Sequence, residues 1–106
     1  MPIYLTQLPF HAVRAFIVDG VPAGISRGGH AHRTTRQLMV LASGSVRIDL
    51  RREGEEISVM LDEARNAVLV GPAIWSRQTY LTADSRIVVF ADEEYDPASY
   101  VSDEQK

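Results

Sequence analysis

Two of the three histidines of this 106-residue chain, His30 and His32, are separated by a single residue in a segment rich in glycine and arginine. On an extended strand, residues two positions apart point to the same face. Two imidazoles that face one pocket can bind a metal ion, or they can move protons near neutral pH. The residues around them bear on which of these chemistries the chain performs.

Three arginines lie close to the histidines: Arg27 before them, and Arg33 and Arg36 after them. The chain contains ten arginines and a single lysine, Lys106. A guanidinium is a planar fork that matches phosphate and carboxylate oxygens, whereas an ammonium is a point charge. The local cluster is therefore a candidate diphosphate site, with the codon usage of a GC-rich genome as the alternative explanation of the arginine content.

Composition excludes several classes of protein. The net charge of −3 argues against a nucleic-acid-binding protein. The absence of cysteine excludes disulfides, thiolate catalysis and cysteine-based zinc sites. No apolar run reaches about 18 residues, and residues 1–7 lack the features of a signal peptide, so we expect a cytoplasmic protein without a membrane span. The length suits one domain over 1–106, with an N-terminal segment at 1–11 and an acidic tail at 92–106.

The apolar segments are short and separated by turn residues. Residues 45–50 alternate between apolar and charged side chains, which predicts a half-buried strand. No segment keeps helical periodicity over more than about two turns. Strands recurring every ~8–12 residues favour an all-β barrel or sandwich. Further strands are predicted at 12–18, 37–41, 56–61, 67–70, 74–80 and 85–91.

Gly24, His30, His32, Gln37 and Gly44 are spaced as in the first sequence motif of the cupin family. Gln37 stands where many cupins have glutamate. The resemblance implies a single-domain, all-β cupin fold, which is a jelly-roll barrel or double-stranded β-helix. This agrees with the strand pattern.

The second cupin motif ends in a histidine, and Ser76 occupies that position. Metal-binding cupins draw their ligands from the two histidines of the first motif, its glutamate and this second-motif histidine. An amide and a hydroxyl are poor ligands for divalent transition metals. We therefore predict that the site holds no metal.

Three separated parts of the chain together resemble the sugar 3,4-ketoisomerases that act on dTDP-4-keto-6-deoxyglucose. They are residues 27–46, which include the segment Arg-Gly-Gly-His-Ala-His and a Ser-Gly-Ser turn, residues 70–75, and residues 94–103. The resemblance implies an isomerase of deoxyamino-sugar biosynthesis that needs no cofactor. It also implies a homodimer whose ligand is a dTDP-linked 4-keto-6-deoxyhexose.

The resemblance implies that His30 and His32 are the acid–base pair that moves the ketone from C4 to C3. Imidazole can act as either acid or base near neutral pH, and we favour His32 as the base at C3. Gln37 would orient a ring nitrogen or bind the sugar oxygens, or would instead satisfy a buried backbone group. Arg27 would bind the diphosphate or an oxyanion, or would instead pair with an acidic residue such as Asp92.

Arg36 is a further expected substrate-binding residue. Trp75 is expected to form the floor of the sugar pocket or to stack on thymine, with a place in the barrel core as the alternative. His11 lies outside every motif, and we expect it at the surface.

Two positions differ from the pattern of the ketoisomerases. Phe16 stands where many members have a tyrosine, and Ser76 follows Trp75 where many have a histidine. These differences keep two other readings open, a non-catalytic nucleotide-sugar-binding cupin and an isomerase or epimerase of another nucleotide sugar. A third reading, a metal-dependent oxygenase, would require a carboxylate or imidazole in place of Ser76, or a ligand from elsewhere in the chain.

Overall fold

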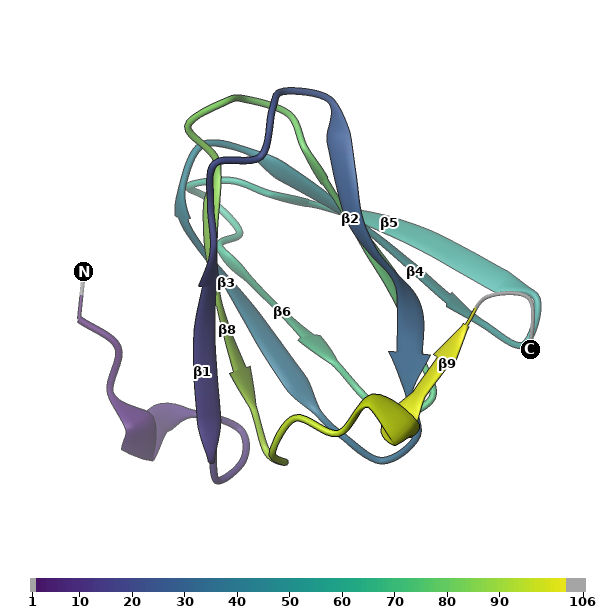
Figure 1. The fold of residues 1–106 in the computed structure, drawn as a ribbon. Helices are drawn as coiled ribbons and strands as arrows, with labels where there is room; N and C mark the ends of the chain where they lie inside the picture. The colour runs from purple at the N-terminus through teal and green to yellow at the C-terminus, as the bar shows by residue number, and fades with distance from the viewer. Residues whose placement is uncertain (1, 103–106) are drawn as a thin grey trace.

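The computed structural model describes residues 2–102 of the chain. Within this range two antiparallel sheets face each other (Figure 1). Parts of the expected segments 1–11 and 92–106, namely Met1 and residues 103–106, lie outside the described residues. The strands are β1 (Arg14–Val18), β2 (Ile25–His32), β3 (Gln37–Ser43), β4 (Val46–Arg52), β5 (Glu55–Leu61), β6 (Ala67–Val70), β7 (Trp75–Tyr80), β8 (Arg86–Ala91) and β9 (Tyr100–Ser102).

The strand order is β1-β8-β3-β6 in the four-stranded sheet and β5-β4-β7-β2-β9 in the five-stranded sheet. The all-β prediction is confirmed, and the sheet arrangement is cupin-like. Among the described residues no strand pairs across the two sheets, so they form two separate layers and not the closed barrel that the motif implied. Side chains, and not a continuous hydrogen-bond ladder, hold the layers together.

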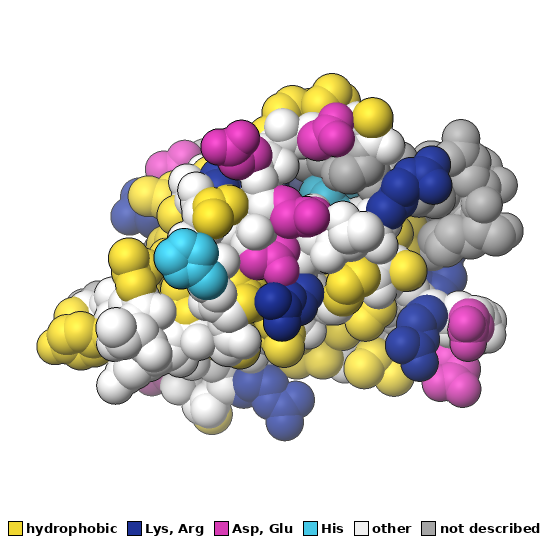
Figure 2. Space-filling view, turned by 90° about the horizontal axis from the view of Figure 1, so that it is seen from below, with side chains coloured by type: hydrophobic (Ala, Val, Ile, Leu, Met, Phe, Trp, Pro, Cys, Tyr) yellow, Lys and Arg dark blue, Asp and Glu magenta, His cyan; other side chains and the backbone are white. Residues whose placement is uncertain are grey.

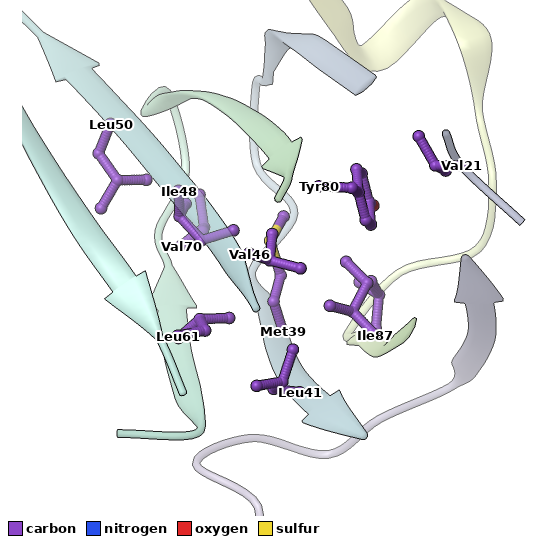
Figure 3. Close-up of a cluster of buried hydrophobic side chains, with 11 residues drawn as sticks. Val21, Met39, Leu41, Val46, Ile48, Leu50, Leu61, Val70, Tyr80 and Ile87 are labelled. Carbon is purple, nitrogen blue, oxygen red and sulfur yellow. The ribbon is translucent and has the colours of Figure 1, made fainter. Parts of the chain in front are cut away.

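The core lies between the inner faces of the two sheets. The alternation in β4 places Val46 and Ile48 inward, where both are completely buried. Met39 on β3 and Ile87 on β8 come from the facing sheet (Figure 3). The complete cluster consists of Val21, Met39, Leu41, Val46, Ile48, Leu50, Leu61, Val70, Tyr80, Ile87 and Val89.

The N-terminal segment covers the outer face of the four-stranded sheet. Phe10 packs there with Val40 and Phe90, and Ile3 and Leu8 lie against the same cluster. The segment includes the short helix η1 (Leu5–Gln7), which is drawn beside β1 in Figure 1. Between residues 2 and 102 there is no helix long and apolar enough to cross a membrane.

The chain returns to the five-stranded sheet after β8. It passes through the helix η2 (Pro97–Ser99), and β9 then pairs with residues 30–32 of β2 (Figure 1). The sequence pattern predicted an acidic tail over residues 92–106 and no strand. A three-residue strand is too short to show periodicity, and it forms because the end of β2 offers unpaired backbone groups.

Candidate functional site

A cavity of about 240 Å³ opens between the two sheets beside the histidines. Inward-facing side chains of five strands line it. They are Phe16, Val18, Arg27, Gly28, His30, His32, Gln37, Met39, Ser76, Gln78, Ile87 and Val89. The predicted residues Arg27, His30, His32 and Gln37 are thus brought together.

A β-bulge in β2 makes this arrangement possible. Arg27 pairs with Gln78 and His30 pairs with Ser76, and the register shifts between these pairs. In a regular strand, residues three positions apart would point to opposite faces. The bulge adds the extra residue that returns Arg27 and His30 to the same face. Gly28 forms it together with the next glycine, at φ values of 89° and 88°.

We expect Gly28→Ala to destabilise the protein and weaken ligand binding in the cavity. The added Cβ would lie 3.1 Å from both amide atoms of Gln78 and from the carbonyl oxygen of Ser76. The loss in unfolding free energy should be about 1–3 kcal/mol. Urea unfolding measures the first effect, and calorimetric titration with TDP, the nucleotide part of the ligand that the sequence resemblance implies, measures the second.

Gly54→Ala is the matched control, because Gly54 has a φ of 83° and its added Cβ would meet nothing within 4 Å. The Gly54→Ala substitution adds the same kind of backbone strain, but its methyl group crowds no neighbouring atom. Equal losses of TDP affinity in both variants would contradict the role given to the bulge.

The two imidazoles form an edge-on pair, with ring centroids 5.6 Å apart and an interplanar angle of 75°. Burial lowers the pKa of His30 below its ordinary value of 6.5. Burial also lowers the pKa of His32, to about 4, and the positive charges of His30 and Arg14 act in the same direction. The carboxylate of Glu93 opposes them. Both rings are therefore neutral at pH 7 and can accept a proton.

The remaining polar groups of the cavity wall are uncharged, apart from Arg27. Gln37 and Ser76 are both buried and line the cavity from facing sheets. Gln78, which the sequence analysis did not single out, adds a second buried amide opposite Arg27. Among residues 2–102 there is no group of three or more histidine, aspartate or glutamate side chains that could hold a metal ion.

Arg36 lies outside the cavity. Its Nε donates a hydrogen bond to Oδ2 of Asp92 at 2.7 Å, and its backbone N–H donates to Oδ1 at 2.7 Å. Its guanidinium carbon also lies 5.5 Å from the centroid of the Phe10 ring. Arg36 therefore connects the β2–β3 loop to the segment after β8. Asp92, the carboxylate suggested above as a partner of Arg27, pairs with Arg36 instead.

Trp75 also lies outside the cavity lining, although it is buried, with only 3% of its surface exposed. It precedes the cavity-facing Ser76 on β7, so its side chain is on the outer face of the five-stranded sheet. The guanidinium carbons of Arg51 and Arg77 lie 4.3 and 5.3 Å from its ring centroid. The structure thus places it neither in the sugar pocket nor in the core between the sheets.

Arg14 is the second residue that the sequence analysis missed. It is on the same face of β1 as Phe16 and Val18, which line the cavity. The side chains of β1 alternate between its two faces, which could have identified Arg14 as a neighbour of the cavity. The strand is largely exposed, however, so the sequence did not show which of its faces points inward. His11 is exposed, as expected.

Comparison with known proteins places these features in a family. The family model described as "FdtA: WxcM-like, C-terminal" matches residues 3–106. A TDP-4-oxo-6-deoxy-α-D-glucose 3,4-oxoisomerase from Aneurinibacillus thermoaerophilus is 29% identical over 95 residues, which are 90% of this chain and 68% of that one.

Solved structures agree in fold. QdtA, a sugar 3,4-ketoisomerase from Thermoanaerobacterium thermosaccharolyticum in complex with TDP, is 30% identical with a TM-score of 0.86, covering 94% of this chain and 74% of that one. A histidine-to-asparagine variant of QdtA in complex with TDP-4-keto-6-deoxyglucose is 28% identical with a TM-score of 0.88, covering 97% and 75%. The TDP-fucose-3,4-ketoisomerase WlaRA from Campylobacter jejuni shares the fold, at 19% identity, a TM-score of 0.88 and coverage of 96% and 77%. With a cupin-like pair of sheets and a family match over nearly its whole length, the chain belongs to the FdtA family of WxcM-like C-terminal domains.

Proposed function

We propose that this protein is a TDP-sugar 3,4-ketoisomerase that moves the keto group of a TDP-linked 4-keto-6-deoxyhexose from C4 to C3. The observation that carries the proposal is the pair of neutral histidines, 5.6 Å apart, inside the cavity of a member of this family. The names of the relatives point to the same reaction. A ligand-binding cavity without turnover has no need of two groups that transfer protons.

The reaction needs only proton transfers. His32 removes the proton from C3, and the electron pair of that C–H bond forms the C3–C4 double bond while the C4 carbonyl oxygen becomes an oxyanion. His30 carries the hydroxyl proton from O3 to O4. The imidazolium of His32 then donates a proton to C4, and O3 becomes the carbonyl oxygen. No electron acceptor and no metal takes part in this scheme.

The other cavity residues hold the substrate in this scheme. Arg27, exposed at one end of the cavity, binds the diphosphate through its guanidinium fork. Gln37 and Gln78 face the cavity from opposite sheets and bind sugar oxygens. Arg36 and Trp75 act as structural residues.

The test is to incubate protein treated with a chelator with TDP-4-keto-6-deoxyglucose in D₂O and to follow the sugar by NMR. The proposal expects the 3-keto sugar, with deuterium at C4 in at least part of the product. A metal requirement would appear as activity that returns only when a divalent metal is added. An unchanged sugar with no deuterium at C3 would contradict isomerase activity.

A second candidate is a nucleotide-sugar-binding protein without turnover. It is favoured by Phe16 and Ser76, which leave the cavity without a tyrosine hydroxyl from β1 and without a third imidazole. Binding of the nucleotide sugar in calorimetry, combined with no deuterium exchange at C3, would support this candidate over the isomerase.

We also propose that the protein is a cytoplasmic homodimer that supplies a 3-keto sugar to an amino-transferring reaction of deoxysugar biosynthesis. Exposed apolar side chains near the free edge of β1 support self-association: Val13 is 50% exposed and Ile17 is 61% exposed. Light scattering coupled to gel filtration distinguishes a dimer of this 11.8 kDa chain from a monomer.

The isomerisation should keep its kcat/KM down to a pH below 6.5. Burial lowers the pKa of both histidines, and the base must be neutral, so activity is lost only as the pH falls through these lowered values. A profile of kcat/KM against pH measures this, with circular dichroism at each pH to confirm folding. An acidic limb at or above pH 6.5 would show that the reacting group is not one of these buried rings.

A further inference from the structure

Arg14 does not itself line the cavity, but its guanidinium lies over the ring of Phe16, which does. The guanidinium carbon lies 5.3 Å from the ring centroid of Phe16 and 5.7 Å from that of Tyr95. Its Nε is enclosed and has no hydrogen-bond partner in the structure. A buried donor of this kind is unusual in a folded protein and calls for an explanation.

The ion pairs recorded between residues 2 and 102 do not include Arg14. Glu93 is the carboxylate that acts electrostatically on the same histidine, but its Oε1 accepts hydrogen bonds from the hydroxyls of Thr34 and Thr35, at 2.7 and 2.6 Å. Acidic side chains gather on the face of the molecule that Figure 2 shows.

Arg14 acts electrostatically on the reacting groups. Its charge lowers the pKa of His32, which lines the cavity. The other groups that act on His32 are His30 on β2 and Glu93 after β8. Arg14 therefore exerts its positive charge where the sugar ring lies in the proposed reaction.

The proposed reaction creates a negative charge on O4. The proton taken from C3 makes His32 an imidazolium at the carbon side of the double bond, while Gln37 and Ser76, the other polar groups near the histidines, carry no charge. Arg27 is separated from His30 by the bulge and faces Gln78, a position suited to the diphosphate. Preorganised positive charge at a developing oxyanion is a large contribution to catalysis.

We propose that Arg14 is a positioning residue that acts through its charge, which stabilises the enediolate oxyanion and holds His32 in its neutral form. The inference rests on the proposed ketoisomerase function. The contacts with two aromatic rings fix the place of the guanidinium before the substrate arrives.

The test compares Arg14→Gln and Arg14→Lys with the wild-type protein in the NMR assay. Arg14→Gln should lower kcat by about 10²-fold with little change in KM, and Arg14→Lys should recover part of the rate. The acidic limb of the pH profile should move to higher pH in Arg14→Gln, because the cation that opposes protonation of His32 is gone. Arg86→Gln is the control, since Arg86 is exposed and pairs with Asp19 at the surface.

A second variant guards against misfolding. In Arg14→Ala, added guanidinium ion should restore part of kcat, which a purely structural loss would not allow. An Arg14→Gln protein that keeps the wild-type kcat and pH profile overturns the role of Arg14 alone. A wild-type protein that catalyses neither isomerisation nor exchange at C3 overturns the proposed function, and the role of Arg14 with it.

Discussion

An asparagine in place of His32 should lower kcat for the C4-to-C3 isomerisation by a factor of about 10²–10⁴, which is the usual contribution of a positioned proton-transfer group. His32 is buried and neutral at pH 7, so it is ready to take the C3 proton. Asparagine keeps a polar side chain of similar reach but cannot be protonated. Deuterium exchange at C3, followed by NMR in D₂O, should be lost together with product formation.

Two further variants sharpen this prediction. His30→Asn should retain exchange at C3 while product formation slows, because His30 is assigned to the hydroxyl proton. His11→Asn should leave both rates unchanged, because this exposed histidine lies outside the cavity. Loss of exchange in His30→Asn with its retention in His32→Asn would reverse the two assignments.

Gly44→Ala should have the largest effect on stability, a loss of about 3 kcal/mol or more in the free energy of unfolding. Gly44 joins β3 to β4 at a φ of 76°, where an alanine is strained by about 1–2 kcal/mol. Its Cβ would also lie 2.5 Å from the Cα of Ser85 and 2.7 Å from Oγ1 of Thr82. A backbone atom cannot move aside cheaply, and overpacking adds about 1–3 kcal/mol.

The loss has a second source in the hydrogen bonds at this turn. The Ser85 hydroxyl donates to the carbonyl oxygen of Ser45 at 2.9 Å and accepts from the N–H of Ser45 at 3.2 Å. Urea unfolding measures the effect. The control is Gly20→Ala, which has a φ of 67° and nothing within 4 Å of the added Cβ. A similar small loss in both variants would show that crowding at Ser85 is relieved.

The fold was predictable where one face of a strand is apolar and the other polar. The alternation of residues 45–50 correctly gave the buried face of β4, and the glycine-rich turns marked most strand ends. The burial of Asp49 was not predictable from this alternation. Asp49, on the outward face, is only 3% exposed because Arg47, Arg77 and Ser58 surround its carboxylate.

The site was predictable only in part. His30, His32, Arg27 and Gln37 line the cavity as expected, because their motif spans one strand and the start of the next. The inward face of β7 could not be read from the sequence, since polar residues occupy both of its faces. The family resemblance implied a place for Trp75 in the pocket, with the barrel core as the alternative, and the alternation of β7 did not show that Trp75 lies on the outer face.

The contribution of Arg14 could not be read from the sequence either. It depends on the packing of β1 against β8, which brings together residues about 75 positions apart along the chain. Sequence spacing carries no record of such a pairing. Tyr95, the second ring beside Arg14, likewise comes from the segment after β8.

Within residues 2–102 the two open sheets end in four edge strands, and these edges differ in chemistry. The edge strand β5 begins with Glu55 and Glu56, whose charges oppose edge-to-edge pairing, and β6 has only four residues. The edge strand β1 instead exposes Ile17, and its one charged residue is Arg14 on the cavity side. In the homodimer proposed above, the β1 edges of two copies would meet around a two-fold axis, and an assembly of this kind closes as a pair. A variant with a charged residue in place of Ile17 would give β1 the same protection against pairing that β5 has.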